Sequence, residues 1–383
     1  MLNKILFGTT AATALLLSAG AQAADDGLVL KVNGFFQGYF QVGSFDDSAA
    51  NGFGNLRSTS LDTWNSEIWF TAEATAANGL KYGFRVELEG YSTSDQIDES
   101  YLYLTGGFGS LKLGNDDGVG NNLAYFIPTP TRSGAIGIED GNYIPNAPAG
   151  GHTLAAFNSP NHYSGDASKI IYTTPAFSGF TFGISYAPEL CEDNVGAAAC
   201  NTGGFETDDT LNQAGDALEL GVKYANKFGD LGVNASFTYY QDKLEAQGVA
   251  PNRDDRKSYA AGAGIAIKGL SLGLNYMHTD NYSAQSYTAA GIDNAKLDQV
   301  LVGVQYVTGP WSVGANYGWG SVEDAAGTAG REDELQAGLV GVGYNVAPGL
   351  EVDAGVQYFD WSSNTASREG SALVGLVGTT LKF

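Results

Sequence analysis

The segment Gly375-Leu376-Val377-Gly378-Thr379-Thr380-Leu381-Lys382-Phe383 decides the fold class of this sequence. Its side chains alternate as in a β-strand, and the pattern runs to the last residue and stops on an aromatic. The opposite end of the chain reads as an export signal. An exported chain whose last strand ends on Phe is typical of a closed transmembrane β-barrel, and this is the fold that we test against the rest of the sequence.

Residues 1–23 have the three parts of a secretory signal. Lys4 supplies the positive start, Leu15-Leu16-Leu17 the apolar middle, and Ala21-Gln22-Ala23 a small-x-small cleavage site. The alternative is a membrane-spanning helix, which requires about 20 apolar residues, and polar residues interrupt this stretch. We therefore expect a cleaved signal peptide over 1–23 and a single domain over 24–383.

The composition of the remaining chain suits many short strands. The sequence has 53 Gly, 21 Tyr and 19 Phe, only 16% of its residues are charged, and no other apolar run is long enough for a membrane helix. Without Lys4, 18 basic residues stand against 42 acidic ones, a net charge of −24. This balance argues against nucleic acid as a partner. It is compatible with a wet lumen and an acidic outer rim.

A period of two repeats along residues 24–383. Tyr82, Phe84, Val86 and Leu88 share one face of a strand whose other face carries Arg85 and further charged residues. Such alternation predicts strands with one apolar and one polar face. Most of the polar faces carry Gly, Ser, Asn and Thr, whereas a soluble sandwich usually has many more charges there.

The connections alternate between tight and long. Seven tight turns that contain Gly, Asn or Pro alternate along the chain with eight longer segments. The longer segments lie near 46–59, 91–96, 115–167, 190–216, 244–257, 281–294, 324–332 and 362–368. Seven turns and eight loops join sixteen antiparallel strands, with both termini on the short-turn, periplasmic side. A β-propeller is the alternative, but no blade motif repeats.

The segment Leu104-Thr105-Gly106-Gly107-Phe108-Gly109-Ser110-Leu111-Lys112-Leu113-Gly114 resembles the strand-turn-strand signature of Gram-negative outer-membrane general porins. Val32-Asn33-Gly34-Phe35 and Phe383 are also similar to that family, especially to its alphaproteobacterial members. The resemblance implies a homotrimer of sixteen-stranded barrels in the outer membrane, in contact with lipid and lipopolysaccharide. It also implies a passive diffusion channel for ions and small hydrophilic solutes, whose long third loop folds into the lumen.

Residues 115–167 are the counterpart of that constriction loop. A structureless stretch of this length is usually functional. The family opposes acidic loop groups to basic groups on the wall, and such opposed charges in a narrow throat create a transverse field. The candidates here are the acids Asp116, Asp117, Glu139 and Asp140 and the bases Lys31, Arg57, Arg85 and Lys112.

The basic wall is thinner than the family pattern. Asp98 and Asn115 stand where members commonly carry Arg, shortly before the signature and directly after its last Gly. Together with the net charge, this departure predicts a weak to moderate preference for cations.

The sequence also bears on a disulfide, a Ca²⁺ site and enzymatic activity. Cys191 and Cys200 are expected to form a disulfide, because an exported protein meets an oxidising compartment. Asp116, Asp117 and Asp140 are weak candidates for a structural Ca²⁺ site, but the EF-hand spacing is missing and turn formation is the simpler interpretation. No motif marks a nucleophile beside any of the three His, so we expect no enzymatic activity.

Two functional hypotheses follow. One is a diffusion channel, with a substrate-selective porin as its variant, and the other is a plugged structural or surface-receptor barrel. Sixteen strands leave an aqueous bore, whereas eight fill with side chains, so the predicted strand number favours the channel.

Overall fold

The structure is a computed structural model. It describes residues 27–46, 56–63, 65–90, 96–138, 152–154, 156–190, 214–244, 255–282, 295–324, 329–365 and 368–383. The predicted signal peptide and the two cysteines therefore lie outside the described residues. Over the described ranges, no helix is long and apolar enough to cross a membrane.

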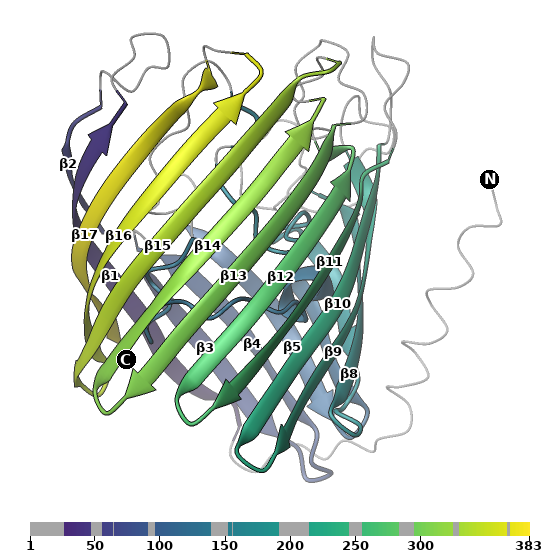
Figure 1. The fold of residues 1–383 in the computed structure, drawn as a ribbon. Helices are drawn as coiled ribbons and strands as arrows, with labels where there is room; N and C mark the ends of the chain where they lie inside the picture. The colour runs from purple at the N-terminus through teal and green to yellow at the C-terminus, as the bar shows by residue number, and fades with distance from the viewer. Residues whose placement is uncertain are drawn as a thin grey trace.

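One antiparallel sheet contains every strand and closes on itself (Figure 1). Its strands are β1 (Val29–Phe45), β2 (Thr59–Asp62), β3 (Glu67–Thr75), β4 (Lys81–Glu89), β5 (Ile97–Gly106), β6 (Gly109–Asn115), β7 (Ser168–Thr173), β8 (Phe180–Glu189), β9 (Ala214–Phe228), β10 (Leu231–Leu244), β11 (Lys257–Ile267), β12 (Leu270–Asp280), β13 (Lys296–Thr308), β14 (Trp311–Glu323), β15 (Glu332–Ala347), β16 (Leu350–Ser363) and β17 (Gly370–Lys382). Strands adjacent in the sequence pair with each other, except that β2 and β3 both pair with β1, and β17 closes the ring by pairing with β1.

The strands labelled β2 and β3 are two halves of one interrupted strand, because both pair with β1. At the interruption Asn65 adopts a left-handed backbone with φ 52°. The Ser66 hydroxyl accepts a hydrogen bond from the Gln37 amide at 3.2 Å, in place of a ladder carbonyl. Counted as crossings, the sheet is the sixteen-stranded antiparallel barrel that the sequence predicts.

The two faces of the strands follow the predicted alternation. On β4, Phe84 is exposed on the outer surface, whereas Glu87 is buried inside. On β9, Leu220 faces outward and Glu219 inward, and on β14 the exposed large hydrophobic residues are Trp311, Val313 and Tyr317. Such an outer surface, apolar at every second position, is the one that a lipid bilayer requires.

Tight turns join the strands at one end of the barrel and long connections at the other (Figure 1). Glycines with positive φ close several tight turns, among them Gly79 at +84° and Gly269 at +88°. Apart from the four-residue half-strand β2, the strands range from 6 residues in β7 to 17 in β1.

Candidate pore and constriction

The described residues of the connection between β6 and β7 lie inside the barrel (Figure 1). We call its described residues, 116–138, 152–154 and 156–167, the inward segment. It begins with one helical turn, α2 (Val119–Asn122), which packs against β8, β9 and β10. The described residues of the predicted constriction loop therefore lie in the lumen.

Glu219 fixes the base of the inward segment. This wall carboxylate is 1% exposed. It accepts hydrogen bonds from the Gly120 amide at 2.6 Å, from the Ser164 hydroxyl at 2.5 Å and from the Ser185 hydroxyl at 3.0 Å. One buried carboxylate thus joins the outgoing arm, the returning arm and strand β8.

Glycines on the inner wall make room for the segment. A Cβ at Gly303 would meet the Pro128 carbonyl and lie 2.8 Å from the Asn316 amide nitrogen, and one at Gly318 would lie 2.6 Å from the Phe157 ring. A Cβ would likewise crowd other residues of the segment at eight further wall glycines: Gly183, Gly221, Gly262, Gly264, Gly273, Gly314, Gly320 and Gly341. These glycines form a track across strands β8 to β15 on which the segment lies.

Wall carboxamides hold the backbone of the segment on this track. Asn275 donates to the Tyr125 carbonyl and Asn316 to the Pro128 carbonyl, each at 2.7 Å. Gln299 exchanges two hydrogen bonds of 2.8 Å with the backbone of Asn158. The segment carries no regular secondary structure beyond α2, so these side chains satisfy backbone groups that a buried loop would otherwise leave unpaired.

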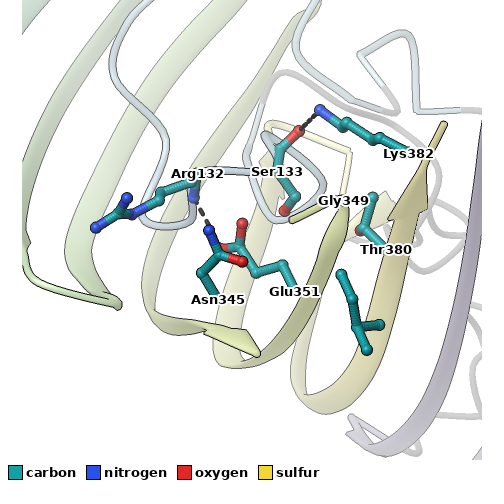
Figure 2. A pocket seen from close by; sticks show the side chains of 8 residues that line it. Arg132, Ser133, Asn345, Gly349, Glu351, Thr380 and Lys382 are labelled. Carbon is teal, nitrogen blue, oxygen red and sulfur yellow. Dashed lines mark hydrogen bonds between the residues drawn. The ribbon is translucent and has the colours of Figure 1, made fainter. Parts of the chain in front are cut away.

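The tip of the segment reaches the short-turn end of the barrel, as Figure 2 shows. The Arg132 amide donates to Glu351 at 3.0 Å, and its guanidinium donates to the carbonyls of the β13–β14 turn. Lys382 donates to the Ser133 carbonyl at 2.9 Å. The Ser133 hydroxyl donates to Asp353 at 3.1 Å. The tip is therefore tied to strands β16 and β17, beside the closing seam.

The largest apolar core lies inside the barrel, between the segment and the wall. Ile136, Ile138, Leu154 and Phe157 of the segment belong to one buried cluster with wall residues Tyr39, Met277, Leu297, Leu301, Leu335, Leu339, Phe359, Trp361 and Leu376. The alternation in the sequence predicts mostly small polar residues on the inner wall. The apolar exceptions are explained by the segment, which covers the inner faces of β12 to β17.

The opposite wall, formed by β3 to β6, remains polar. Arg85 forms an ion pair with Glu87 on the same strand, and its guanidinium lies 4.5 Å from the centre of the Trp69 ring. Glu67, Glu87 and Asp98 place carboxylate oxygens within 4.8 Å of one another. A β-bulge between β4 and β5 shifts the register beside Glu87, and bulges of this kind re-aim side chains. Of this acidic cluster, the sequence alone singles out only Asp98, as a departure from the family pattern.

The predicted basic residues pair with nearby acids. Besides Arg85, Lys112 bonds to Asp116 at the start of the segment. Lys31 lies 3.9 Å from Glu73 near the short-turn end, with 59% of its side chain exposed. Arg57 is exposed just before β2, at the long-loop end.

The predicted loop acids are only partly described. Burial raises the pKa of the Asp116 carboxyl, and the Lys112 ammonium opposes that shift. Asp117 lies 3.4 Å from the His162 ring. Glu139 and Asp140 lie outside the described residues, as do Cys191 and Cys200, so the field across the throat, the disulfide and the Ca²⁺ site stay predictions.

Comparisons with known proteins agree with this architecture. A sequence model of the family described as Gram-negative porin matches residues 11–364. A protein named monosaccharide porin, from a Halomonas species, is 25% identical over 331 residues, which cover 76% of this chain and 81% of the relative. The major outer membrane protein of Halomonas elongata matches to the same extent.

Solved structures share the fold at low identity. OmpT of Vibrio cholerae, folded in vitro and in a trimer form, superposes with a TM-score of 0.59 at 17% identity, over 94% of this chain and 100% of OmpT. A variant of Rh. blastica porin superposes with a TM-score of 0.54 at 18% identity, over 93% of this chain and 100% of that one.

Proposed function

Because this chain belongs to the Gram-negative porin family, and is therefore an outer-membrane channel and not an enzyme, we propose that it passes ions and small hydrophilic solutes by passive diffusion. The route lies between the inward segment and the polar wall of β3 to β6. We further propose a weak to moderate preference for cations. The name of the Halomonas relative, a monosaccharide porin, supports small polar solutes as the cargo.

The acidic cluster of Glu67, Glu87 and Asp98 carries the proposed cation preference. Three carboxylates gather there beside the single guanidinium of Arg85, which Glu87 already pairs. Asp98 stands where the family resemblance leads one to expect Arg. Fixed negative charge on a pore wall raises the local concentration of cations, and salt screens the effect over about 10 Å at 0.1 M.

The apolar core inside the barrel favours the second candidate, a plugged surface or receptor barrel. Liposome swelling separates the two functions. Proteoliposomes in isotonic solutions of uncharged sugars of increasing size should swell, and the rate should fall with solute size. If no sugar enters and no current crosses a planar bilayer, the barrel is plugged.

A homotrimer is the proposed assembly. The structural neighbour OmpT occurs in a trimer form, and the resemblance to general porins points the same way. Native mass spectrometry of the detergent-extracted protein tests this assembly, and a monomer as the sole species would contradict it.

A further inference from the structure

A cavity lies between the tip of the inward segment and the wall of β1, β3 and β4, and we propose that it is a binding subsite for uncharged, hydroxyl-rich solutes of monosaccharide size. The proposal rests on the proposed diffusion function and names the solute class that the route retains. The polar route would then contain a binding site. A solute would pause at this point on its way through.

The cavity has the size of a small-molecule site. Its volume is about 490 Å³, within the roughly 300–1,000 Å³ typical of ligand pockets. Ser133 and Gly134 close it on the side of the segment. The wall side includes Asn33, Phe35, Gln37, Asn65, Trp69 and Arg85, and the chain end contributes Lys382 and Phe383.

The polar lining matches hydroxyl groups. Asn33, Gln37 and Asn65 contribute three carboxamides, each of which has both donor and acceptor atoms. A sugar hydroxyl also donates and accepts, so it pairs with a carboxamide in either direction. A carboxylate or an ammonium group would use only one half of each carboxamide.

The charge of the lining also favours an uncharged solute. Two basic side chains line the cavity: Arg85 forms an ion pair with Glu87, and Lys382 donates to the Ser133 carbonyl at 2.9 Å. An anionic solute would have to compete with these internal acceptors. A neutral solute can accept a hydrogen bond from the guanidinium without separating the pair.

Trp69 gives the cavity a rigid apolar wall. Its indole nitrogen donates to Glu67 at 2.6 Å, and its ring meets Phe35 edge-on at a centroid distance of 5.6 Å. The Arg85 guanidinium covers the ring at 4.5 Å. A fixed aromatic body with a few convergent polar groups is the usual make-up of a ligand pocket.

The interrupted strand shapes this cavity. Asn65, in its left-handed conformation, lies in the break between β2 and β3, and the neighbouring Ser66 holds the Gln37 amide. Asn65 and Gln37, two of the three carboxamide residues, are therefore positioned by this interruption, the one that the described strands contain. Irregular strands are over-represented next to functional sites, where they re-aim side chains.

The test is the effect of D-glucose on the ion current through the purified protein in a planar bilayer. Occupancy of the subsite should reduce the K⁺ current in a saturable way, with half-saturation on the order of millimolar. Asn33→Ala and Asn65→Gly each remove one carboxamide, and Gly tolerates the left-handed backbone at position 65. Each variant should raise the half-saturating concentration about 2- to 10-fold.

Asn226→Ala is the matched control, because Asn226 is exposed near the β9–β10 turn and its side chain bonds to Tyr224 and Lys227 beside it. It should leave half-saturation unchanged. Tryptophan fluorescence in detergent gives a second readout that requires no conduction, and a saturable glucose response should be lost in Trp69→Phe.

Two negative results are distinguishable. A linear decrease of current that is the same in all variants, together with unchanged fluorescence, would overturn the subsite and leave the diffusion channel standing. A barrel that never conducts, but whose fluorescence still saturates with glucose, would keep the subsite and overturn the diffusion function.

Discussion

Arg85 shows how a single charge is housed on the pore wall. Its neighbours in sequence, Phe84 and Val86, lie on the opposite face, so the guanidinium is directed away from lipid. A mid-membrane Arg toward lipid would cost about 2–4 kcal/mol. Inside, the guanidinium lies between the Glu87 carboxylate and the Trp69 ring. Arg85 therefore both fills space and offsets part of the acidic cluster.

Replacing Arg85 by Ala should raise the single-channel conductance and the cation-to-anion permeability ratio. The change removes bulk from the cavity lining and leaves the carboxylates of Glu67, Glu87 and Asp98 without their guanidinium. Lys268→Ala is the control, because it removes a positive charge from an exposed turn where 76% of the side chain is accessible. Unchanged conductance and selectivity in a correctly folded Arg85→Ala protein would show that Arg85 does not line the constriction.

Glu219→Ala should loosen the inward segment without opening the barrel. The substitution leaves the Gly120 amide and the hydroxyls of Ser164 and Ser185 without their shared acceptor. Each buried donor left unpaired costs about 1–3 kcal/mol. The open-channel current should become noisier, and added protease should cut within 116–167. Glu323→Ala, at an exposed strand end, should change neither, and a quiet, resistant Glu219→Ala channel would contradict the anchoring role.

At the scale of elements, the inward segment depends on the absence of side chains from the wall. Gly303→Ala would bring a methyl group against the Pro128 carbonyl and the Asn316 side-chain amide. These two groups form one of the hydrogen bonds that hold the segment on the wall. We expect a lower free energy of unfolding, by about 1–3 kcal/mol, and an altered conductance.

Gly338→Ala is the matched control for that change. It also adds one methyl group to a mid-strand glycine, but its Cβ would meet no atom within 4 Å. Urea unfolding followed by tryptophan fluorescence compares the two proteins. Equal stabilities and equal conductances would contradict the proposed seating of the segment on the glycine track.

The elements show where sequence reasoning succeeds and where it stops. Lipid requires an apolar side chain at every second position, so pairs such as Leu220 and Glu219 reveal their faces without a structure. The break between β2 and β3 depends on a contact between Ser66 and Gln37, 29 residues apart, which no local pattern records. The path of the inward segment is likewise set by wall glycines that, in the sequence, resemble any other strand glycine.

At the scale of the whole molecule, the lumen has two unlike sides. The inward segment covers the inner faces of β12 to β17 with an apolar core, and the wall of β3 to β6 stays polar and acidic. Sequence analysis expected basic wall residues to face loop acids. In the described residues Lys112 pairs with the loop acid Asp116, whereas Arg85 and Lys31 lie beside the wall acids Glu87 and Glu73. Such pairing depends on rotamers and register, which the sequence does not specify.

The central claim is that the protein conducts ions along the polar side of the lumen and that acidic groups there set its selectivity. The zero-current potential across a planar bilayer in a KCl gradient tests both parts at once. We predict an open channel whose reversal potential has the sign of K⁺ preference and moves toward zero as the salt concentration on both sides rises, because salt screens fixed charge. A reversal potential with the sign of Cl⁻ preference, or the absence of any current, would contradict the account.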